Sequence, residues 1–410
     1  MVGAGIIGLA VARELLRRDP GTRLTVFEKE ARVAAHQTGH NSGVVHAGLY
    51  YTPGSLKARL CRRGVGLLRE FCAEQGLAYE ERGKLVVART DAEAAALRDI
   101  EARARANGVP GLRWLTADGL TELEPQVRGV AGLRWLSGGE LTELEPHVAG
   151  VAALHSPHTA IVDYAAIARA LAGDITAAGG RLRLAARVSE LRSVGSGVQL
   201  VAGGERHRFD RLVVCAGLQS DRLARLAGDG RSPAILPFRG EYFRLRPERG
   251  DLVHRLIYPV PDPAYPFLGV HFTPRVDGTV DIGPNAVLAL SREGYRRRDV
   301  RAADLLDTLR APGFVRFASA HWRVGARELR GSLSRRAFLA QARGFVPALR
   351  DEDVVPARAG VRAQALGSRG DLLDDFSLTR LGGMVLVRNA PSPAATSSLA
   401  IAEHVADRLE

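Results

Sequence analysis

Met1-Val2-Gly3-Ala4-Gly5-Ile6-Ile7-Gly8 opens the chain, and an apolar run from Leu9 to Leu16 follows directly. Gly3, Gly5 and Gly8 form the pattern G-x-G-x-x-G. The first glycine permits a tight turn, the second lets a pyrophosphate approach the backbone, and the third lets a helix pack on a strand. The first turn of such a helix also offers free N–H groups and a positive dipole end to phosphates. This stretch predicts a nucleotide-binding unit of strand, turn and helix.

A carboxylate stands where this unit needs one. After a turn at Asp19-Pro20-Gly21, an apolar run from Leu24 to Phe27 leads to Glu28, 20 residues beyond Gly8. An acid in this position binds a ribose hydroxyl. A buried strand should precede the glycines, yet only Met1 and Val2 do so. We therefore expect either that the true start lies upstream, which we favour, or that a core strand is missing and the protein is poorly stable.

The remaining pattern predicts two intertwined domains. A helix is expected from Ser55 to Gly76, a strand over 84–88 and a second helix over 91–107. Short alternating runs broken by Pro and Gly fill residues 237–287, which is typical of an antiparallel sheet, and strand–helix units return at the end of the chain. The predicted fold class is α/β: a Rossmann-like cofactor domain with a doubly wound, mostly parallel sheet, and an inserted α+β substrate domain built on an antiparallel sheet. The cofactor domain is expected over 1–85, 155–232 and 355–410, and the substrate domain over 86–154 and 233–354.

A tandem duplication lies inside the second of these domains. Residues 112–132 (LRWLTADGLTELEPQVRGVAG) are followed directly by residues 133–153 (LRWLSGGELTELEPHVAGVAA), and the two copies are identical at 14 of 21 positions. Two copies are too few for a solenoid. We expect one copy to bulge from the surface, where insertions are tolerated, and to add no function.

Composition narrows the class of protein. Hydrophobic residues make up 46% and charged residues 25% of the 410 residues, and no apolar run approaches the roughly 18 residues of a spanning helix. Three dispersed cysteines, Cys61, Cys72 and Cys215, indicate a reducing compartment without disulfides. With no signal peptide recognised, we expect a cytoplasmic protein.

The net charge of +12 comes almost entirely from arginine, because the only lysines are Lys29, Lys57 and Lys84. The arginines are spread along the chain, which favours a solvated surface over a nucleic-acid-binding face. A mild attraction for anionic substrates or lipid head groups is compatible with this charge. No amphipathic helix is recognised in the sequence in support of a membrane contact.

With these features in view, the chain resembles the L-2-hydroxyglutarate oxidase/dehydrogenase family, within the FAD-dependent, D-amino-acid-oxidase-like oxidoreductases. The resemblance extends nearly end to end. The segments that carry it are HQTGHNSGVVHAGLYYTPGSLKARLC (36–61), VVCAGLQSDRLA (213–224), FRGEYFRL (238–245), YPVPDPAYPFLGVHFT (258–273), AGVRAQ (359–364) and NAPSPAAT (389–396).

The resemblance implies FAD as cofactor and assigns residues to its parts. The ADP half would be held by Gly3, Gly5, Gly8 and Glu28, with Val188 and the Ala216-Gly217 turn on the adenine and ribose side. The segment 38–43 would wrap the pyrophosphate and approach the flavin. Gly360 and the segment 389–396 would contact the ribityl chain or the flavin carbonyls. The residues singled out in these two segments are Thr38, His40, Asn41, Ser42, Gly43, Asn389, Pro391, Ser392 and Ala394.

The reaction implied is oxidation of L-2-hydroxyglutarate by hydride transfer to flavin N5. Arg362 matches an arginine that binds the substrate carboxylate in related flavoenzymes, and a guanidinium suits that task because its planar fork pairs with both oxygens. Histidine suits the base that accepts the hydroxyl proton, and either His46 or His271 is expected to be this base. Tyr258 is a candidate donor to the substrate, and Tyr51 is a weaker one.

Other charged and polar groups receive lesser roles. A second substrate carboxylate would need another cation, for which Arg239 or Arg388 is available. His36 and His40 are expected to have structural roles as side chains, and no cluster has metal-ligand spacing, so no metal is expected. Related chains commonly carry histidine at the position of Leu386, which predicts a slower enzyme or an altered substrate choice.

Two alternatives stay open. The same apparatus serves an FAD-dependent amino-acid or amine oxidase, and the missing strand, the duplication and Leu386 are compatible with a catalytically impaired flavin-binding remnant. The expected partners are a small 2-hydroxy dicarboxylate and, as electron acceptor, oxygen or a quinone, with no nucleic acid. A quinone user would contact the membrane peripherally, at the inner face.

Overall fold

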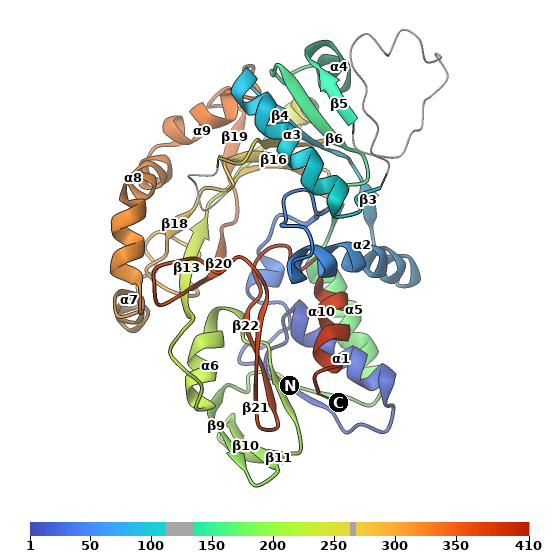
Figure 1. The fold of residues 1–410 in the computed structure, drawn as a ribbon, viewed down its shortest axis with the longest axis vertical. Helices are drawn as coiled ribbons and strands as arrows, with labels where there is room; N and C mark the ends of the chain where they lie inside the picture. Colours follow the sequence, from blue (N-terminus) through green and yellow to red (C-terminus); the bar gives the residue numbers. More distant parts are fainter. Residues whose placement is uncertain (111–133, 263–267, 410) are drawn as a thin grey trace.

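A computed structural model describes residues 1–110, 134–262 and 268–409 (Figure 1). Its lower half is built on a sheet whose strands are parallel except for one terminal hairpin. In spatial order the sheet runs through β8 (Arg181–Arg183), β1 (Thr25–Phe27), Val2, β12 (Leu212–Val214), β22 (Met384–Asn389) and β21 (Ser377–Leu381). The first and last parts of the chain thus share one sheet.

Val2 joins the two halves of this sheet. Its N–H donates to the carbonyl of Val213 (2.9 Å), and its own carbonyl accepts from the N–H of Cys215 (2.8 Å). On the other side, the N–H of Phe27 donates to the carbonyl of Met1 (3.0 Å). The position expected for a strand before the glycine motif is therefore filled by Met1 and Val2 between β1 and β12.

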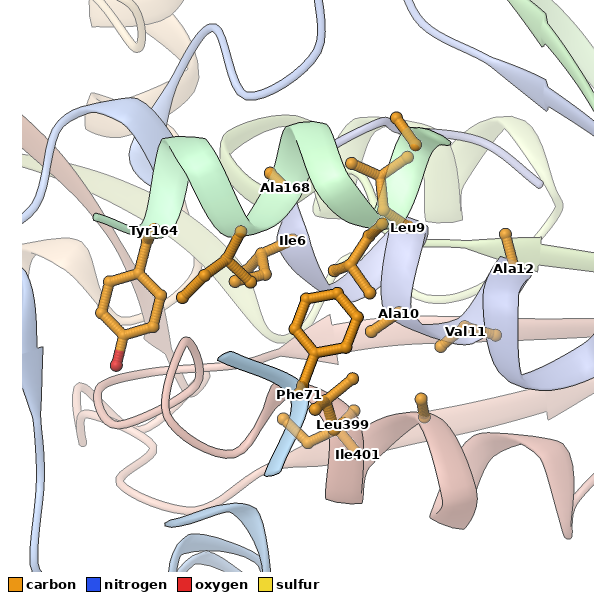
Figure 2. Close-up of a cluster of buried hydrophobic side chains, with 14 of the residues drawn as sticks. Ile6, Leu9, Ala10, Val11, Ala12, Phe71, Tyr164, Ala168, Leu399 and Ile401 are labelled. Carbon is orange, nitrogen blue, oxygen red and sulfur yellow. The ribbon is translucent and has the colours of Figure 1, made fainter. Parts of the chain in front are cut away.

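A layer of helices covers one face of the sheet. It consists of α1 (Ile6–Arg18), α5 (Tyr164–Ala177), α2 (Leu56–Glu74) and α10 (Ser398–Ala406). Figure 2 shows how side chains from all four helices meet in one apolar cluster, with Ile6 and Leu9 facing Phe71, Ala168 and Leu399. This packing fixes the start of α1 above the carboxyl ends of the central strands, where doubly wound folds bind ligands.

Further strands complete this half. An antiparallel meander of β9 (Val188–Val194), β10 (Gly197–Ala202) and β11 (Glu205–Phe209) packs, with α6 (Ser220–Leu226), against the side of the sheet occupied by Val2 and Val214. A small antiparallel sheet contains β2 (Val44–Val45), β7 (Ala160–Val162) and β3 (Tyr79–Glu81). Short 3-10 turns lie at η1 (Gln37–Gly39), η2 (Gly217–Gln219) and η3 (Pro247–Leu252).

The upper half is an eight-stranded sheet. Its strands, in spatial order, are β19 (Val354–Pro356), β14 (Phe243–Leu245), β17 (Val280–Gly283), β16 (His271–Pro274), β15 (Leu256–Pro259), β4 (Lys84–Ala88), β6 (Ala152–Ser156) and β5 (Arg134–Ser137). All neighbours are antiparallel except β15 and β4, which are parallel. The helices α3 (Asp91–Ala106), α4 (Gly138–Leu144) and α9 (Arg335–Arg343) lie against this sheet (Figure 1).

A long two-stranded ribbon links the two halves. β13 (Ala234–Gly240) pairs with β20 (Gly360–Leu366) along its whole length, and β18 (Val287–Leu288) adds a short third strand. Helices α7 (Ala302–Leu309) and α8 (Phe314–Leu333) run down the outer side of the molecule next to this ribbon (Figure 1). The predicted fold class is confirmed. The helix expected from Ser55 is also present, because α2 begins after the N-cap Ser55, whose hydroxyl accepts from the N–H of Ala58 (3.1 Å).

The second copy of the duplicated segment forms β5 and α4. Ser137 and Glu140 make a reciprocal capping box at the start of α4, and the buried carboxylate of Glu145 accepts from the N–H groups of His254 and Arg255. The first copy carries Thr116 and Gly119 at the positions of this capping box. That copy, expected to bulge from the surface, lies outside the described residues.

Candidate active site

Two cavities meet at the start of α1 and together make one elongated site. They share the lining residues Gly5, Gln37, Thr38, Cys215 and Gly217. The first cavity, of about 270 Å³, extends over β1 and the meander, and the second, of about 420 Å³, extends toward the ribbon and the upper sheet. A ligand with two distinct halves fits such a shape.

The first cavity is built by the glycine motif. Gly3 has a φ of +98°, and a Cβ there would lie 2.3 Å from the carbonyl oxygen of Cys215. A Cβ at Gly8 would lie 2.0 Å from the carbonyl oxygen of Gly3, so the close approach of helix and strand excludes any side chain. The carboxylate of Glu28 lines this cavity and accepts from the N–H of Ala4 (2.8 Å). Val188, Ala216 and Gly217 line the same cavity.

The second cavity collects most of the other residues expected to hold the cofactor. They are Thr38, His40, Asn41, Ser42, Gly360, Asn389, Pro391, Ser392 and Ala394. Thr38 also positions the helix, because its hydroxyl accepts from the N–H of Ile6 (3.0 Å). Gly43, in contrast, is not among the residues lining either cavity, and a Cβ there would lie 2.8 Å from the carbonyl oxygen of Val162, which indicates a structural glycine.

These residues fit the expected FAD. Gly5 lines both cavities and places no side chain between the first turn of α1 and a pyrophosphate. The Oδ1 atom of Asn389 is buried at the second cavity without a hydrogen-bond partner among the described residues. A buried acceptor of this kind is costly unless it meets a donor, which a cofactor with ring N–H groups supplies.

Two candidates for the chemistry, Tyr258 and His271, lie opposite each other on the antiparallel strands β15 and β16. Their rings stack with centroids 3.9 Å apart, and both residues line the second cavity. His271 Nδ1 lies 2.9 Å from the carbonyl oxygen of Gly269, which assigns the proton to Nδ1 and leaves Nε2 as an acceptor. Burial, followed by the nearby Lys84 and Arg362, lowers the pKa of His271 to about 3, so its imidazole is neutral.

His46 approaches the same cavity from the loop after β2. Its Nε2 lies 3.4 Å from the hydroxyl of Ser392, and its N–H donates to the hydroxyl of Thr396 (3.1 Å). Burial lowers the pKa of His46 to about 3, and the charges of Lys84 and Lys57 act in the same direction. Both candidate bases therefore lie at the second cavity, and His46 also lies next to the cofactor segment 389–396.

Arg362 also lines the second cavity, from the ribbon strand β20, and its guanidinium lies 3.5 Å from the carbonyl oxygen of Asn285. The arginines considered for a second carboxylate already have acidic partners, although Arg388 also lines the second cavity. Arg239 is paired with Glu241 (3.0 Å), and Arg388 is paired with Asp229 and donates to the carbonyl of Pro233 (3.1 Å).

Lysine residues at the site were missed by sequence reasoning. Lys57 lines the second cavity, where its ammonium donates to Asp374 (2.6 Å), and Lys29 lines the first. Lys84 is buried immediately behind Tyr258. Because nearly all other basic residues of the chain are arginines, the three lysines are conspicuous in the composition and could have been recognised as candidates for the site.

Several other residues are accounted for by local contacts. The imidazole Nδ1 of His40 donates to the carbonyl oxygen of Ala359 (3.0 Å), and the ring stacks on Tyr295. Glu30, His36 and Glu293 come close enough to hold a metal ion, but the ammonium of Lys29 already contacts all three groups. Leu386 belongs to the apolar cluster around Val2 and is not among the residues lining either cavity.

Comparison with known proteins agrees with this architecture. A family described as FAD dependent oxidoreductase (DAO) matches residues 1–133 and 126–408, two stretches that overlap within the duplicated segment. The chain is 42% identical to the mitochondrial L-2-hydroxyglutarate dehydrogenase of Homo sapiens, over 100% of this chain and 88% of that protein. It is 41% identical to the L-2-hydroxyglutarate dehydrogenase of Escherichia coli K12, over 100% of this chain and 92% of that protein.

Solved structures share the fold at lower identity. An FAD-bound, dithionite-reduced L-alpha-glycerophosphate oxidase from Mycoplasma pneumoniae superposes with a TM-score of 0.75 at 21% identity, over 100% of this chain and 93% of that one. Glycine oxidase from Geobacillus kaustophilus gives 0.70 at 21% identity, with the same coverage.

Proposed function

Because the chain belongs to the family of FAD-dependent oxidoreductases, we propose that this enzyme oxidises L-2-hydroxyglutarate to 2-oxoglutarate. One observation carries the proposal: a single site runs from the glycine motif to a buried end where Arg362, Tyr258, His271 and His46 meet. The substrate assignment is supported by the 41–42% identity to L-2-hydroxyglutarate dehydrogenases over nearly the whole chain. We further propose that the lower half is the cofactor domain and the upper half the substrate domain, over the residue ranges expected from the sequence.

The cofactor residues act by binding and orientation. When bound, FAD supplies the acceptor for the hydride, at N5 of its flavin. We assign the ADP half to the cavity of Gly3 and Glu28, and the flavin half to the cavity of Asn389 and Ser392.

In this proposal Arg362 binds the carboxylate next to the reacting carbon. The guanidinium offers two parallel N–H donors, which fixes both the position and the plane of the carboxylate. Its place on β20, paired along its length with β13, gives it a rigid support. A fixed carboxylate aligns the neighbouring C–H and O–H bonds, and such alignment contributes a large part of the rate in enzymes of this kind.

His271 is our preferred base. Its Nδ1 is held by the carbonyl of Gly269, so Nε2 is the free acceptor, and the lowered pKa keeps it unprotonated before substrate binds. Tyr258 stacks on its ring and limits its rotation. His46 is next to the cofactor segment through Ser392, and we assign it an orienting role.

We propose a peripheral contact with an anionic membrane surface and favour a quinone over oxygen as electron acceptor. The support is a set of exposed side chains just before α7 and along α7 and α8, called here the α7–α8 surface. Its apolar members are Val300, Leu306, Leu309, Val315, Trp322, Leu329 and Leu333. Four exposed arginines lie along the same helix α8: Arg316, Arg323, Arg327 and Arg330. Apolar side chains flanked by arginine are suited to the boundary of a bilayer with anionic lipids.

Among the helices of the described ranges, none is both long enough and apolar enough to cross a membrane.

The reductive half-reaction tests the main proposal. The FAD-loaded protein is mixed with L-2-hydroxyglutarate without oxygen, and the flavin absorbance near about 450 nm is followed. We expect bleaching with L-2-hydroxyglutarate and none with the D-isomer, glycine or sarcosine. Bleaching by an amino acid alone would establish the amine-oxidase alternative, and a loaded protein that stays oxidised with all of them would support the impaired remnant.

The choice of base is tested by a matched pair of variants. His271→Asn should slow flavin reduction by about 10²- to 10⁴-fold, the usual contribution of a general base. His46→Asn should have a smaller effect on the same rate. The reverse order would transfer the role of base to His46.

A further inference from the structure

Lys84, the first residue of β4, is a buried cation outside the assignments made above. It is 2% exposed and forms no ion pair with a carboxylate in the described part of the chain. Its ammonium instead lies 4.6 Å from the ring centroid of Tyr50 and 3.7 Å from that of Tyr258. Buried charges are costly unless they are paired, and here aromatic faces take the place of an anion.

Lys84, Tyr258 and His271 form a three-layer stack. The ammonium and the imidazole centroid lie 3.7 Å and 3.9 Å from the centroid of the Tyr258 ring. Two groups that close to the same ring centre would collide on one face, so they occupy opposite faces. The order is therefore cation, phenol ring, imidazole, with the imidazole at the cavity.

We propose that Lys84 is a positioning residue for the reaction: its ammonium, on the far face of the Tyr258 ring, holds the stack in place and disfavours a second positive charge on His271, so that Nε2 faces the substrate as an acceptor. This inference rests on the proposed role of His271 as base. Lys84 does not touch the reacting atoms.

The surroundings of His271 support this role. The charged groups that face it are Lys84 from β4 and Arg362 from β20, and both lower its pKa in addition to burial. The other titratable neighbours are Tyr258, whose pKa is raised by burial, and His46, which is held neutral by burial. Burial also lowers the pKa of Lys84 to about 7, so its charge is fully present in the more acidic range in which His271 would take up a proton.

The proton and the electrons are accounted for in one step. The O–H bond of the substrate breaks and its proton passes to Nε2 of His271. The C–H bond of carbon 2 breaks, and bound FAD would accept the hydride, so the electron pair of the former O–H bond forms the carbonyl between carbon 2 and its oxygen. A cation on the far face of Tyr258 then favours release of the proton from the imidazolium.

The test reads the pKa of His271 directly in the FAD-loaded enzyme without substrate. The protein is labelled with [13Cε1]histidine, the signal of His271 is assigned with His271→Asn, and its shift is followed against pH. In Lys84→Met the pKa of His271 should rise by on the order of one pH unit, because a like charge has been removed. In Lys84→Arg it should stay low. An unchanged pKa in a folded, FAD-retaining Lys84→Met would overturn the proposal.

A second measurement covers the case in which Lys84→Met does not fold. In the wild-type protein, deprotonation of Lys84 should produce an additional inflection in the His271 shift near pH 7. That inflection should be absent in Lys84→Arg, since a guanidinium does not titrate there. A wild-type curve without it would also overturn the proposal. Because neither readout uses substrate, failure of the substrate assignment would be seen separately, in the bleaching experiment.

Discussion

Arg362 and Arg239 carry the same charge on paired strands of one ribbon, yet their surroundings differ. Arg239 is buried against Glu241, whereas Arg362 lines the cavity next to Tyr258. Charge alone therefore does not identify a carboxylate-binding residue. What distinguishes Arg362 from Arg239 is its place among the residues that line the second cavity.

The first prediction concerns the shape of this guanidinium. Arg362→Lys keeps the charge but loses the bidentate fork, and should raise the KM for L-2-hydroxyglutarate by about 10- to 100-fold, corresponding to the roughly 1.5–3 kcal/mol of a charge-assisted hydrogen bond. Steady-state kinetics with an artificial acceptor measure it. Arg350→Lys, on the exposed surface, is the control and should leave KM unchanged. Equal KM values in both variants would remove Arg362 from carboxylate binding.

At this scale the sequence predicted the placement of residues that belong to a local motif. Gly3, Gly5 and Glu28 lie at the first cavity because their spacing alone defines a turn and a helix start. Lys84 and Lys57 could not be placed in this way. Their proximity to the candidate bases depends on pairing of β4 with β15 and on the packing of α2, which are contacts between distant segments.

Helix α2 contains two glycines with opposite environments. A Cβ at Gly64 would lie 2.4 Å from the carbonyl oxygen of Thr396, in the cofactor segment, whereas a Cβ at Gly66 would meet nothing within 4 Å. The first glycine allows close packing of helix and loop. The second only weakens the helix, because glycine has the larger conformational entropy to lose.

These environments predict opposite changes in stability. Gly66→Ala should raise the free energy of unfolding by about 0.5–1 kcal/mol. Gly64→Ala should lower it by about 1–3 kcal/mol, the usual range for overpacking, and should also weaken FAD retention. Urea unfolding and flavin content measure the two effects. A stabilising Gly64→Ala would mean that the loop 389–396 can move away without cost.

The elements best predicted from the sequence were those with caps or uninterrupted apolar runs. The helix starting after Ser55 and the strand Lys84–Ala88 are examples. Helices α7, α8 and α9 were not predicted. Helix α8 places Val315, Trp322 and Leu329 at steps of seven residues, which puts them on one face of the helix. This face is exposed, so its apolar residues do not mark a side of the helix that packs in the core.

The α7–α8 surface predicts binding to anionic vesicles. Trp322→Ser combined with Leu329→Ser should weaken binding at least about tenfold, since each buried apolar side chain contributes about 1.5–3 kcal/mol. Co-sedimentation with vesicles containing phosphatidylglycerol measures it. Leu184→Ser, a similar change outside this surface, should have no effect. Equal binding of wild type and the double variant would assign another face to the membrane.

For the whole molecule, the duplicated segment offers a deletion that the fold should tolerate. The second copy already supplies β5, α4 and the buried Glu145, so removal of residues 112–132 leaves the sheet edge intact. The thermal midpoint, flavin content and rate of flavin reduction should all stay at the wild-type level. A deletion protein that loses FAD or unfolds would show that the first copy carries a structural role.

At the same scale, the order of elements along the chain predicted the α/β class, because glycine-rich strand–helix units at both ends flank a block of short strands. The spatial order of strands was not predictable. It depends on which distant segments pair, as β12 does with β22, and on Val2 bridging two half-sheets with a single residue.

That bridge has a consequence for how the protein is made. Met1 and Val2 are synthesised long before their neighbour β12 and its partner β22, and α1 is synthesised long before α10. Figure 1 shows the two labelled chain ends near each other in the lower half of the molecule. The glycine turn therefore lacks its full support until β22 and α10 have emerged from the ribosome. Flavin should be acquired only after that point, and nascent chains should depend on chaperones until then.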